Sequence, residues 1–159
     1  MNQIRIESPD SDERTGCERV LRSLPAWFGI ESALMEYVED TAHLPTFVLR
    51  QGEELAGFIS LCQHFPRAWE VHCIALHAEV RGKGLGAQLL GHAEKWMAAQ
   101  GAKLIQVKTI AEANPSPAYM QTRAFYTRMG YMPFQVFPEL WSKSNPCLQM
   151  LKIIDREFQ

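Results

Sequence analysis

The chain has 159 residues, of which 47% are hydrophobic and 21% are charged, and its formal net charge is −2 at pH 7. This length suits one domain with its own hydrophobic core, so we expect a single domain over residues 1–159. The charge balance excludes a broad basic surface that would bind nucleic acid. No apolar run approaches the roughly 20 residues of a membrane-spanning helix, and the N-terminus lacks the profile of a signal peptide. We therefore expect a cytoplasmic protein without nucleic-acid or membrane partners.

The four cysteines predict neither disulfides nor a metal site. Cys17, Cys62, Cys73 and Cys147 form no C-x-x-C pair, and their spacing matches no zinc pattern. His72 and Cys73 are adjacent, and adjacent residues of a strand point to opposite faces, so they would hardly share one ion. We expect reduced thiols and no metal.

Hydrophobic patterning predicts short strands and helices in the first half of the chain. In order, the patterns predict a strand at 4–6, helices at 17–24 and 30–38, a hairpin of strands at 46–50 and 55–61, a loop at 64–67 and a strand at 69–77. The last of these is apolar on both faces, which predicts a central place in a sheet.

The second half predicts one βαβ unit and an antiparallel end. In order, we expect a helix from Leu85 that Gly101 terminates, a strand at 104–110, a loop at 111–117, a helix at 118–129, a strand at 131–137, a loop at 138–146 and a final strand at 148–154. This order predicts a mixed α/β sandwich with one core.

A glycine-rich turn, Arg81-Gly82-Lys83-Gly84-Leu85-Gly86, lies between the central strand and the following helix. The first N–H groups of a helix lack intrahelical partners and carry the positive end of its dipole, so they attract anions. The spacing of the glycines excludes a P-loop and the dinucleotide-binding fingerprint. Taken alone, the turn is equally typical of an ordinary connection between a strand and a helix.

Two segments resemble the signatures of the GNAT superfamily of N-acetyltransferases. Residues 76–90 resemble its acetyl-coenzyme A motif, whose core [RQ]-x-x-G-x-[GA] is met by Arg81, Gly84 and Gly86. Residues 122–131, which read Thr-Arg-Ala-Phe-Tyr-Thr-Arg-Met-Gly-Tyr, are similar to the second signature. The resemblance implies an α/β fold with a mixed, mostly antiparallel central sheet of about seven strands, flanked by about four helices, with a splayed central strand pair.

The resemblance also implies acetyl-coenzyme A as the co-substrate. Its pyrophosphate would lie on the backbone N–H groups of Arg81, Gly82, Lys83, Gly84, Leu85 and Gly86. Backbone groups of Ile74 and Leu76 would pair with the pantetheine arm, and the Leu76 N–H would polarise the thioester carbonyl. Where many members have an asparagine that contacts this arm, the chain has Tyr119, with Asn114 nearby.

The implied reaction is acyl transfer from a thioester to an amine by direct attack in a ternary complex. The amine must lose a proton and the thiolate must gain one. Tyr126 matches the family tyrosine beside the sulfur, so it is the expected acid. Glu70 occupies the strand position where histone-acetylating members carry a base. His72 is the alternative base, because its ordinary pKa is near neutrality, and a water-mediated relay is a third route.

In this architecture the acceptor site is lined by the two N-terminal helices, their connector and the loop before the last strand. These segments carry Trp27, Phe28 and Trp141, and Trp69 starts the central strand. Such aromatic side chains suit an apolar amine or a cation. We expect the primary amine of a small molecule or a peptide as the acceptor, and the sequence is compatible with a homodimer.

Two other interpretations stay open. A non-catalytic acyl-coenzyme A-binding or sensing domain would keep the cofactor site without turnover. A nucleotide-binding module would use the glycine-rich turn for the phosphates of a nucleotide such as ATP. Tyr126 and a candidate base favour the enzyme.

Overall fold

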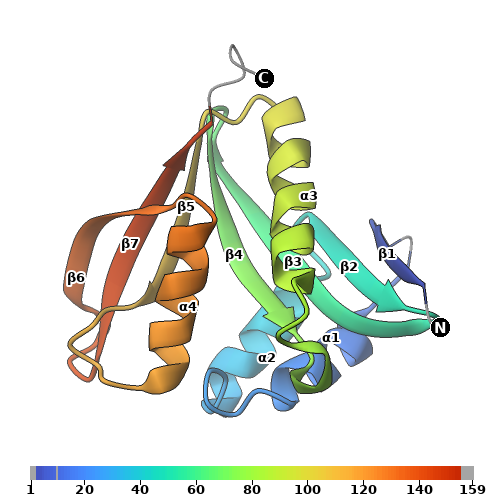
Figure 1. Ribbon diagram of the computed structural model, residues 1–159, viewed down its shortest axis with the longest axis horizontal. Helices are drawn as coiled ribbons and strands as arrows, with labels where there is room; N and C mark the ends of the chain where they lie inside the picture. Colours follow the sequence, from blue (N-terminus) through green and yellow to red (C-terminus); the bar gives the residue numbers. More distant parts are fainter. Residues whose placement is uncertain (1–2, 10, 155–159) are drawn as a thin grey trace. The chain divides into compact units, whose positions relative to one another are not determined.

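The computed structural model describes residues 3–9 and 11–154. Its elements are β1 (Ile4–Glu7), α1 (Arg14–Arg22), α2 (Glu31–Asp40), β2 (Thr46–Gln51), β3 (Glu54–Phe65), β4 (Ala68–Leu76), the 3₁₀ helix η1 (Ala78–Val80), α3 (Leu85–Ala99), β5 (Leu104–Ile110), α4 (Pro117–Arg128), β6 (Met132–Ser142) and β7 (Asn145–Ile153). Within this described part, seven strands and four α-helices confirm the predicted fold class (Figure 1). None of the described helices has the length and apolar character that a membrane span requires.

The strands follow the order β1-β2-β3-β4-β5-β7-β6. The pairs β1–β2, β2–β3, β5–β7 and β6–β7 are antiparallel. β4 and β5 are parallel, and their register comprises three residue pairs: Ala68 with Leu104, Trp69 with Ile105 and Glu70 with Gln106. The predicted central place of β4 is therefore correct.

Contacts within the chain gather in two units, which we describe separately. The first comprises Met1–Cys62 and Val71–Ala99, and the second comprises Gln63–Glu70 and Gln100–Gln159. β3 and β4 therefore contribute residues to both units. A single domain stays a prediction.

In the first unit, helices cover both faces of the strands. Phe47 on β2 packs edge-on against Trp96 of α3, with ring centroids 5.5 Å apart. Its neighbour Val48 belongs to the buried cluster that includes residues of α1 and α2. Adjacent residues of a strand point to opposite faces, so α3 lies on one face and α1 and α2 lie on the other (Figure 1).

The apolar stripes of α1 and α2 form this cluster. Val20 and Leu21 of α1 and Leu34 and Val38 of α2 are almost fully buried. Burying each such side chain stabilises a fold by about 1.5–3 kcal/mol relative to exposure. Burial also raises the pKa of the Cys17 thiol to about 12, so this thiol is protonated and unreactive at neutral pH.

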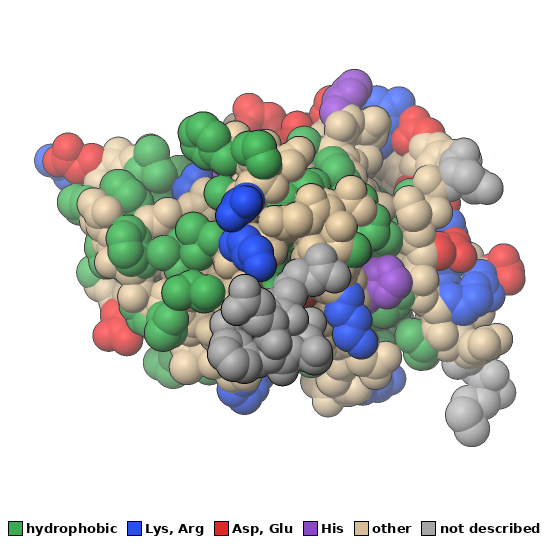
Figure 2. Space-filling view, turned by 90° about the horizontal axis from the view of Figure 1, so that it is seen from above, with side chains coloured by type: hydrophobic (Ala, Val, Ile, Leu, Met, Phe, Trp, Pro, Cys, Tyr) green, Lys and Arg blue, Asp and Glu red, His purple; other side chains and the backbone are tan. Residues whose placement is uncertain are grey.

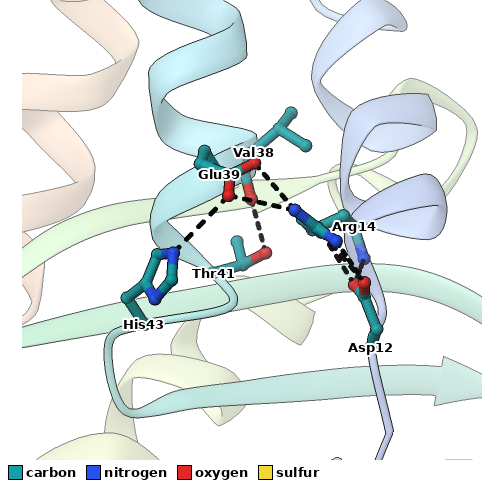
Figure 3. A network of polar contacts seen from close by, with 6 residues as sticks. All are labelled: Asp12, Arg14, Val38, Glu39, Thr41 and His43. Carbon is teal, nitrogen blue, oxygen red and sulfur yellow. Dashed lines mark hydrogen bonds and ion pairs between the residues drawn. The ribbon is translucent and has the colours of Figure 1, made fainter.

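A polar network ties the end of α2 to the start of α1 (Figure 3). The Arg14 guanidinium pairs with Asp12 at 2.7 Å and with Glu39 at 2.8 Å. Its hydrogen bonds hold the pKa of the Glu39 carboxyl below its ordinary value. The Thr41 hydroxyl closes the last turn of α2 by donating to the Val38 carbonyl at 2.7 Å. The network therefore fixes the end of the helix that carries Asp40.

In the second unit, α4 packs against β5. The Arg123 side chain donates to the Ile110 carbonyl at 2.6 Å, which ties the helix to the end of that strand. The helix stops where Gly130 adopts a φ of +94°, and the Tyr131 N–H then donates to the Tyr126 carbonyl at 3.0 Å. This glycine C-cap confirms the predicted end of the helix.

Two predicted loops are tight hairpins instead. β6 and β7 extend through most of the segment 138–146, and Lys143-Ser144 turns between them. Likewise β3 and β4 leave Pro66-Arg67 as their turn. Prolines suggested the first loop, but Pro138 lies on an exposed edge strand, where its missing N–H is tolerated.

β6, an edge strand, exposes several large apolar side chains. Its large exposed hydrophobic residues are Met132, Phe134, Val136, Leu140 and Trp141. Hydrophobic side chains also gather on the left of Figure 2, the side on which Figure 1 draws β6. Protein surfaces of this kind commonly mark contact with a partner. The compatibility with a homodimer stays a prediction.

Gly57 on β3 allows β4 to approach closely at Leu76. A Cβ added at Gly57 would lie 2.5 Å from Cδ2 of Leu76 and 3.0 Å from the carbonyl oxygen of Ala75. We predict that Gly57→Ala lowers the free energy of unfolding by about 1–3 kcal/mol, because the added methyl group overpacks this contact. Chemical denaturation measures the change.

Gly91→Ala in α3 is the matched control. No heavy atom lies within 4 Å of a Cβ built at Gly91. The same methyl group should therefore be neutral or raise the stability by up to about 1 kcal/mol, as alanine does in a helix interior. Equal destabilisation by the two substitutions would contradict the close approach at Gly57.

Candidate active site

The glycine-rich turn lies between two buried anchors. Val80 and Leu85 are 7% and 6% exposed, respectively. Between them, Gly82 and Gly84 adopt φ values of +79° and +77°, a conformation that glycine adopts without strain. A Cβ at either glycine would meet no heavy atom within 4 Å. Because the turn is open and α3 begins at Leu85, its backbone can cradle an anion.

Hydrogen bonds fix the segment that leads into this turn. The His77 N–H donates to the Ala56 carbonyl at 2.8 Å. The Ala78 N–H donates to the Ser23 hydroxyl at 3.0 Å. Nδ1 of His77 accepts from the Glu79 N–H at 3.2 Å, so this histidine caps η1.

Arg81 and Lys83 add positive charge at the turn, and both side chains are exposed. Cζ of Arg81 lies 4.4 Å from the centroid of the Trp27 ring, which is within cation–π distance. The chain as a whole is slightly acidic, yet the positive charges of Arg81 and Lys83 and the backbone dipoles favour an anion at this turn.

Ile74 and Leu76 lie on β4 just before the turn. Ile74 is half-buried and Leu76 is 9% exposed. Ala75 between them joins the cluster beneath α1 and α2, so the side chains of Ile74 and Leu76 point to the other face. Their backbone contacts with a pantetheine arm stay a prediction.

Glu70 is a buried carboxylate surrounded by hydrogen-bond donors. Its side chain is 9% exposed, and Oε1 lies 2.6 Å from Nε2 of His64. Oε1 also accepts from Gln106 at 3.2 Å, while Oε2 lies 3.5 Å from Nζ of Lys108. An ionised carboxylate can only accept hydrogen bonds, so Nε2 of His64 carries the proton in this pair.

His64 is a residue of this cluster that the sequence did not predict. Its side chain is 41% exposed, so it connects the buried Glu70 carboxylate to solvent. The available signal was the short spacing between the two residues, which suits a tight hairpin. A loop expected at 64–67 concealed that signal, because β3 continues through Phe65.

His72 pairs with Asp40 at the end of α2. Its Nε2 lies 2.8 Å from Oδ2 of Asp40, and its ring centroid lies 5.3 Å from that of Tyr37. The carboxylate accepts, so Nε2 donates, and Nδ1 is the nitrogen with which a neutral ring would accept a proton. A carboxylate that orients an imidazole in this way is typical of a general base. Glu70 and His72, the two candidate bases on β4, thus have different partners.

Tyr126 is buried on α4 at 6% exposure. Its ring packs 5.4 Å from Phe125 and 5.6 Å from Tyr131. These contacts fix the ring, and a rigid phenol can both pack and donate a proton. Its role as the acid stays a prediction.

The loop before α4 is held by Asn114. Its Nδ2 donates to the Ser144 carbonyl at 3.1 Å, and its Oδ1 accepts from the Ser116 N–H at 2.9 Å. This side chain therefore fastens the loop to the β6–β7 turn. Tyr119, the residue at the family's asparagine position, is half-buried, and burial raises the pKa of its phenol.

The predicted aromatic residues differ in accessibility. Trp69 is 5% exposed and belongs to the core, while Trp141 is 46% exposed on β6. Trp27 and Phe28 are half-buried in the connector between α1 and α2. Trp27 and Phe28 are therefore the better candidates for an acceptor wall. Among the residues that the structure describes, no group of three His, Cys, Asp or Glu side chains is arranged to hold a metal ion.

The comparisons with known proteins identify a family for the chain. The model of the acetyltransferase (GNAT) family matches residues 13–131. The mycothiol acetyltransferase of Corynebacterium glutamicum (strain R) is 35% identical over 83 residues, which are 52% of this chain and 26% of that protein. The chain thus spans about a quarter of the length of this curated relative.

Solved structures share the fold along nearly the whole chain. A GNAT-family protein from Desulfovibrio desulfuricans superposes with a TM-score of 0.83 at 16% identity, over 96% of this chain and 100% of that one. An aminoglycoside 6'-N-acetyltransferase complexed with coenzyme A superposes with a TM-score of 0.74 at 21% identity, over 96% and 98%. At these identities the likeness shows the fold alone. The family model, however, covers both the glycine-rich turn and Tyr126, and the chain belongs to the acetyltransferase (GNAT) family.

Proposed function

We propose that this protein transfers an acetyl group from acetyl-coenzyme A to the primary amine of a small molecule, by direct attack in a ternary complex. The observation that carries the proposal is the open, positive-φ turn at the start of α3, inside the segment that the family model matches. The amine of a peptide is the alternative acceptor within the same chemistry.

The turn fits the pyrophosphate of coenzyme A. Glycine leaves the space in front of the backbone open, and replacing Gly82 or Gly84 with a larger residue would place a side chain in that space. The N–H groups from Arg81 to Gly86 and the dipole of α3 would bind the phosphate oxygens. On the preceding strand, the N–H of Leu76 would donate to the thioester carbonyl and stabilise its developing negative charge.

Two residues are candidates for accepting the proton of the ammonium. His72 has a ring oriented by Asp40 and a lone pair on Nδ1, whereas both oxygens of Glu70 already face donors. We therefore favour His72 as the base, with Glu70 as the alternative. If Glu70 accepts the proton, His64 offers its route to solvent, because His64 is bonded to Glu70 and partly exposed.

Tyr126 would donate its phenol proton to the departing thiolate. Packing against Phe125 and Tyr131 restricts its ring, so the hydroxyl is held in place. A general acid of this kind contributes about 10²–10⁴-fold to a rate.

A small-molecule acceptor is favoured by the connector and by the named relatives. Trp27 and Phe28 offer apolar ring faces for a compact amine. The names of the mycothiol and aminoglycoside acetyltransferases indicate small-molecule acceptors for those two proteins.

Gly84→Glu should abolish tight binding of coenzyme A. The substitution places a negative side chain where the pyrophosphate would lie, so we predict a Kd at least about tenfold higher. Isothermal titration calorimetry measures it. Gly91→Glu is the control, because it adds the same charge on α3 with open space around it, and it should bind normally. Unchanged binding by the Gly84 variant would show that the cofactor site lies elsewhere.

Tyr126→Phe should lower kcat by about 10- to 100-fold with little change in coenzyme A affinity, because only the proton donor is removed. Thiol release from acetyl-coenzyme A with an accepted amine measures kcat. Tyr131→Phe removes a hydroxyl from the neighbouring ring and should leave kcat within a few-fold. An unchanged rate in the Tyr126 variant would remove this residue from the mechanism.

His72→Gln should reduce kcat/KM by about 100-fold or more, since a general base contributes about 10²–10⁴-fold. Glu70→Gln should have the smaller effect. The same thiol-release assay, run with both variants, compares them. A larger loss of kcat/KM in Glu70→Gln than in His72→Gln would assign the proton transfer to Glu70 and contradict our choice.

Thiol release measured with a panel of amines distinguishes the enzyme from a sensing domain. An enzyme releases thiol with at least one amine, whereas a sensor is stabilised by coenzyme A and releases none with any amine. Thermal stabilisation by ATP but not by coenzyme A would instead support a nucleotide-binding module.

A further inference from the structure

The connector, residues 24–30, is folded into a short turn that presents two aromatic rings. The N–H groups of Trp27 and Phe28 both donate to the Leu24 carbonyl, at 3.1 and 3.0 Å. The two rings contact different partners. Trp27 lies under the guanidinium of Arg81, and Phe28 packs edge-on against Tyr37 with ring centroids 5.7 Å apart.

The contact between Arg81 and Trp27 holds a cation beside the glycine-rich turn. Cζ of Arg81 lies 4.4 Å from the ring centroid, and Gly82 of the turn follows directly in sequence. Arg14 and Arg22, by contrast, meet carboxylates at 2.6–2.8 Å. A carboxylate neutralises the guanidinium that it holds, whereas an aromatic face holds it with its charge intact. The charge of Arg81 is therefore available to a bound anion.

A second contact joins the same two segments. The hydroxyl of Ser23, just before the connector, accepts from the Ala78 N–H at 3.0 Å. The chain from Ala78 to Arg81 therefore contacts Ser23 at one end and Trp27 of the connector at the other. Movement of one segment would strain these contacts with the other.

The other end of the connector leads to the candidate base. Phe28 packs on Tyr37, and the ring of Tyr37 lies 5.3 Å from that of His72. The connector therefore packs against both the proposed cofactor turn and the helix that supports His72.

We propose that Trp27 is a positioning residue for coenzyme A: it holds the Arg81 guanidinium beside the pyrophosphate, and coenzyme A binding in turn orders the connector. This inference rests on the proposed function, because it assumes that the pyrophosphate lies at the turn. The effect is reciprocal, since a contact that favours binding must itself be favoured by binding. Coenzyme A would then prepare the aromatic wall before the acceptor arrives.

The test is a double-mutant cycle on coenzyme A affinity, measured by isothermal titration calorimetry. Trp27→Leu should raise the Kd about two- to fivefold, the range expected for an exposed cation–π contact. Trp27→Phe keeps an aromatic face and should restore most of the affinity. Arg81→Met should also raise the Kd. Trp27→Leu should then have no further effect in the Arg81→Met background, because both substitutions remove one contact.

Hydrogen exchange gives a second measurement, which needs no acceptor amine. Coenzyme A should slow the exchange of the connector amides in the wild-type protein. This slowing should be lost in Arg81→Met, which changes an exposed side chain and leaves the connector sequence intact. The Arg81 variant therefore keeps the test decisive even if Trp27→Leu does not fold.

The outcomes separate this inference from the proposed function. A wild-type protein that does not bind coenzyme A overturns the proposed function and the inference with it. A wild-type protein that binds, with a Trp27→Leu variant of equal affinity, overturns the inference alone. If Trp27→Leu also lowers coenzyme A affinity in the Arg81→Met background, the inference is overturned, because Trp27 would then act through the fold and not through Arg81.

Discussion

The proposed site depends on a backbone turn that only glycine accommodates easily. Gly82 and Gly84 have positive φ angles, and the buried side chains of Val80 and Leu85 fix the two ends of the turn. The buried ends hold the turn at the start of α3, and the missing Cβ atoms leave its N–H groups accessible. A chain with a net charge of −2 can therefore attract an anion at one place without a basic surface.

Pairs of a carboxylate and an imidazole orient the side chains that support the candidate chemistry. Each candidate base takes part in a carboxylate–imidazole pair: Asp40 with His72 in the first unit, and Glu70 with His64 in the second. Each carboxylate fixes which ring nitrogen carries the proton. The network around Arg14 steadies the end of α2, and with it the Asp40 carboxylate (Figure 3).

The sequence predicted what depends on local periodicity. The strands and helices of the first half follow from apolar spacing, and the turn at Gly82 and Gly84 follows from composition and resemblance. It did not predict that His64 contacts Glu70, because the loop expected at 64–67 concealed the hairpin between them. Nor did it predict that His72 contacts Asp40, because the two residues are 32 positions apart along the chain. It also gave a loop at 138–146 where an exposed edge strand tolerates proline. Asn114 illustrates the same limit, since its hydrogen bonds cross to the β6–β7 turn.

The most direct test of the account is an NMR titration of the ¹⁵N-labelled protein with coenzyme A. Backbone N–H groups that bind the pyrophosphate change their chemical environment most. The account predicts that the amide signals of residues 81–86 shift most strongly, followed by those of the connector. Saturable shifts confined to other segments, or no shifts at all, would contradict the assignment of the turn as the cofactor site.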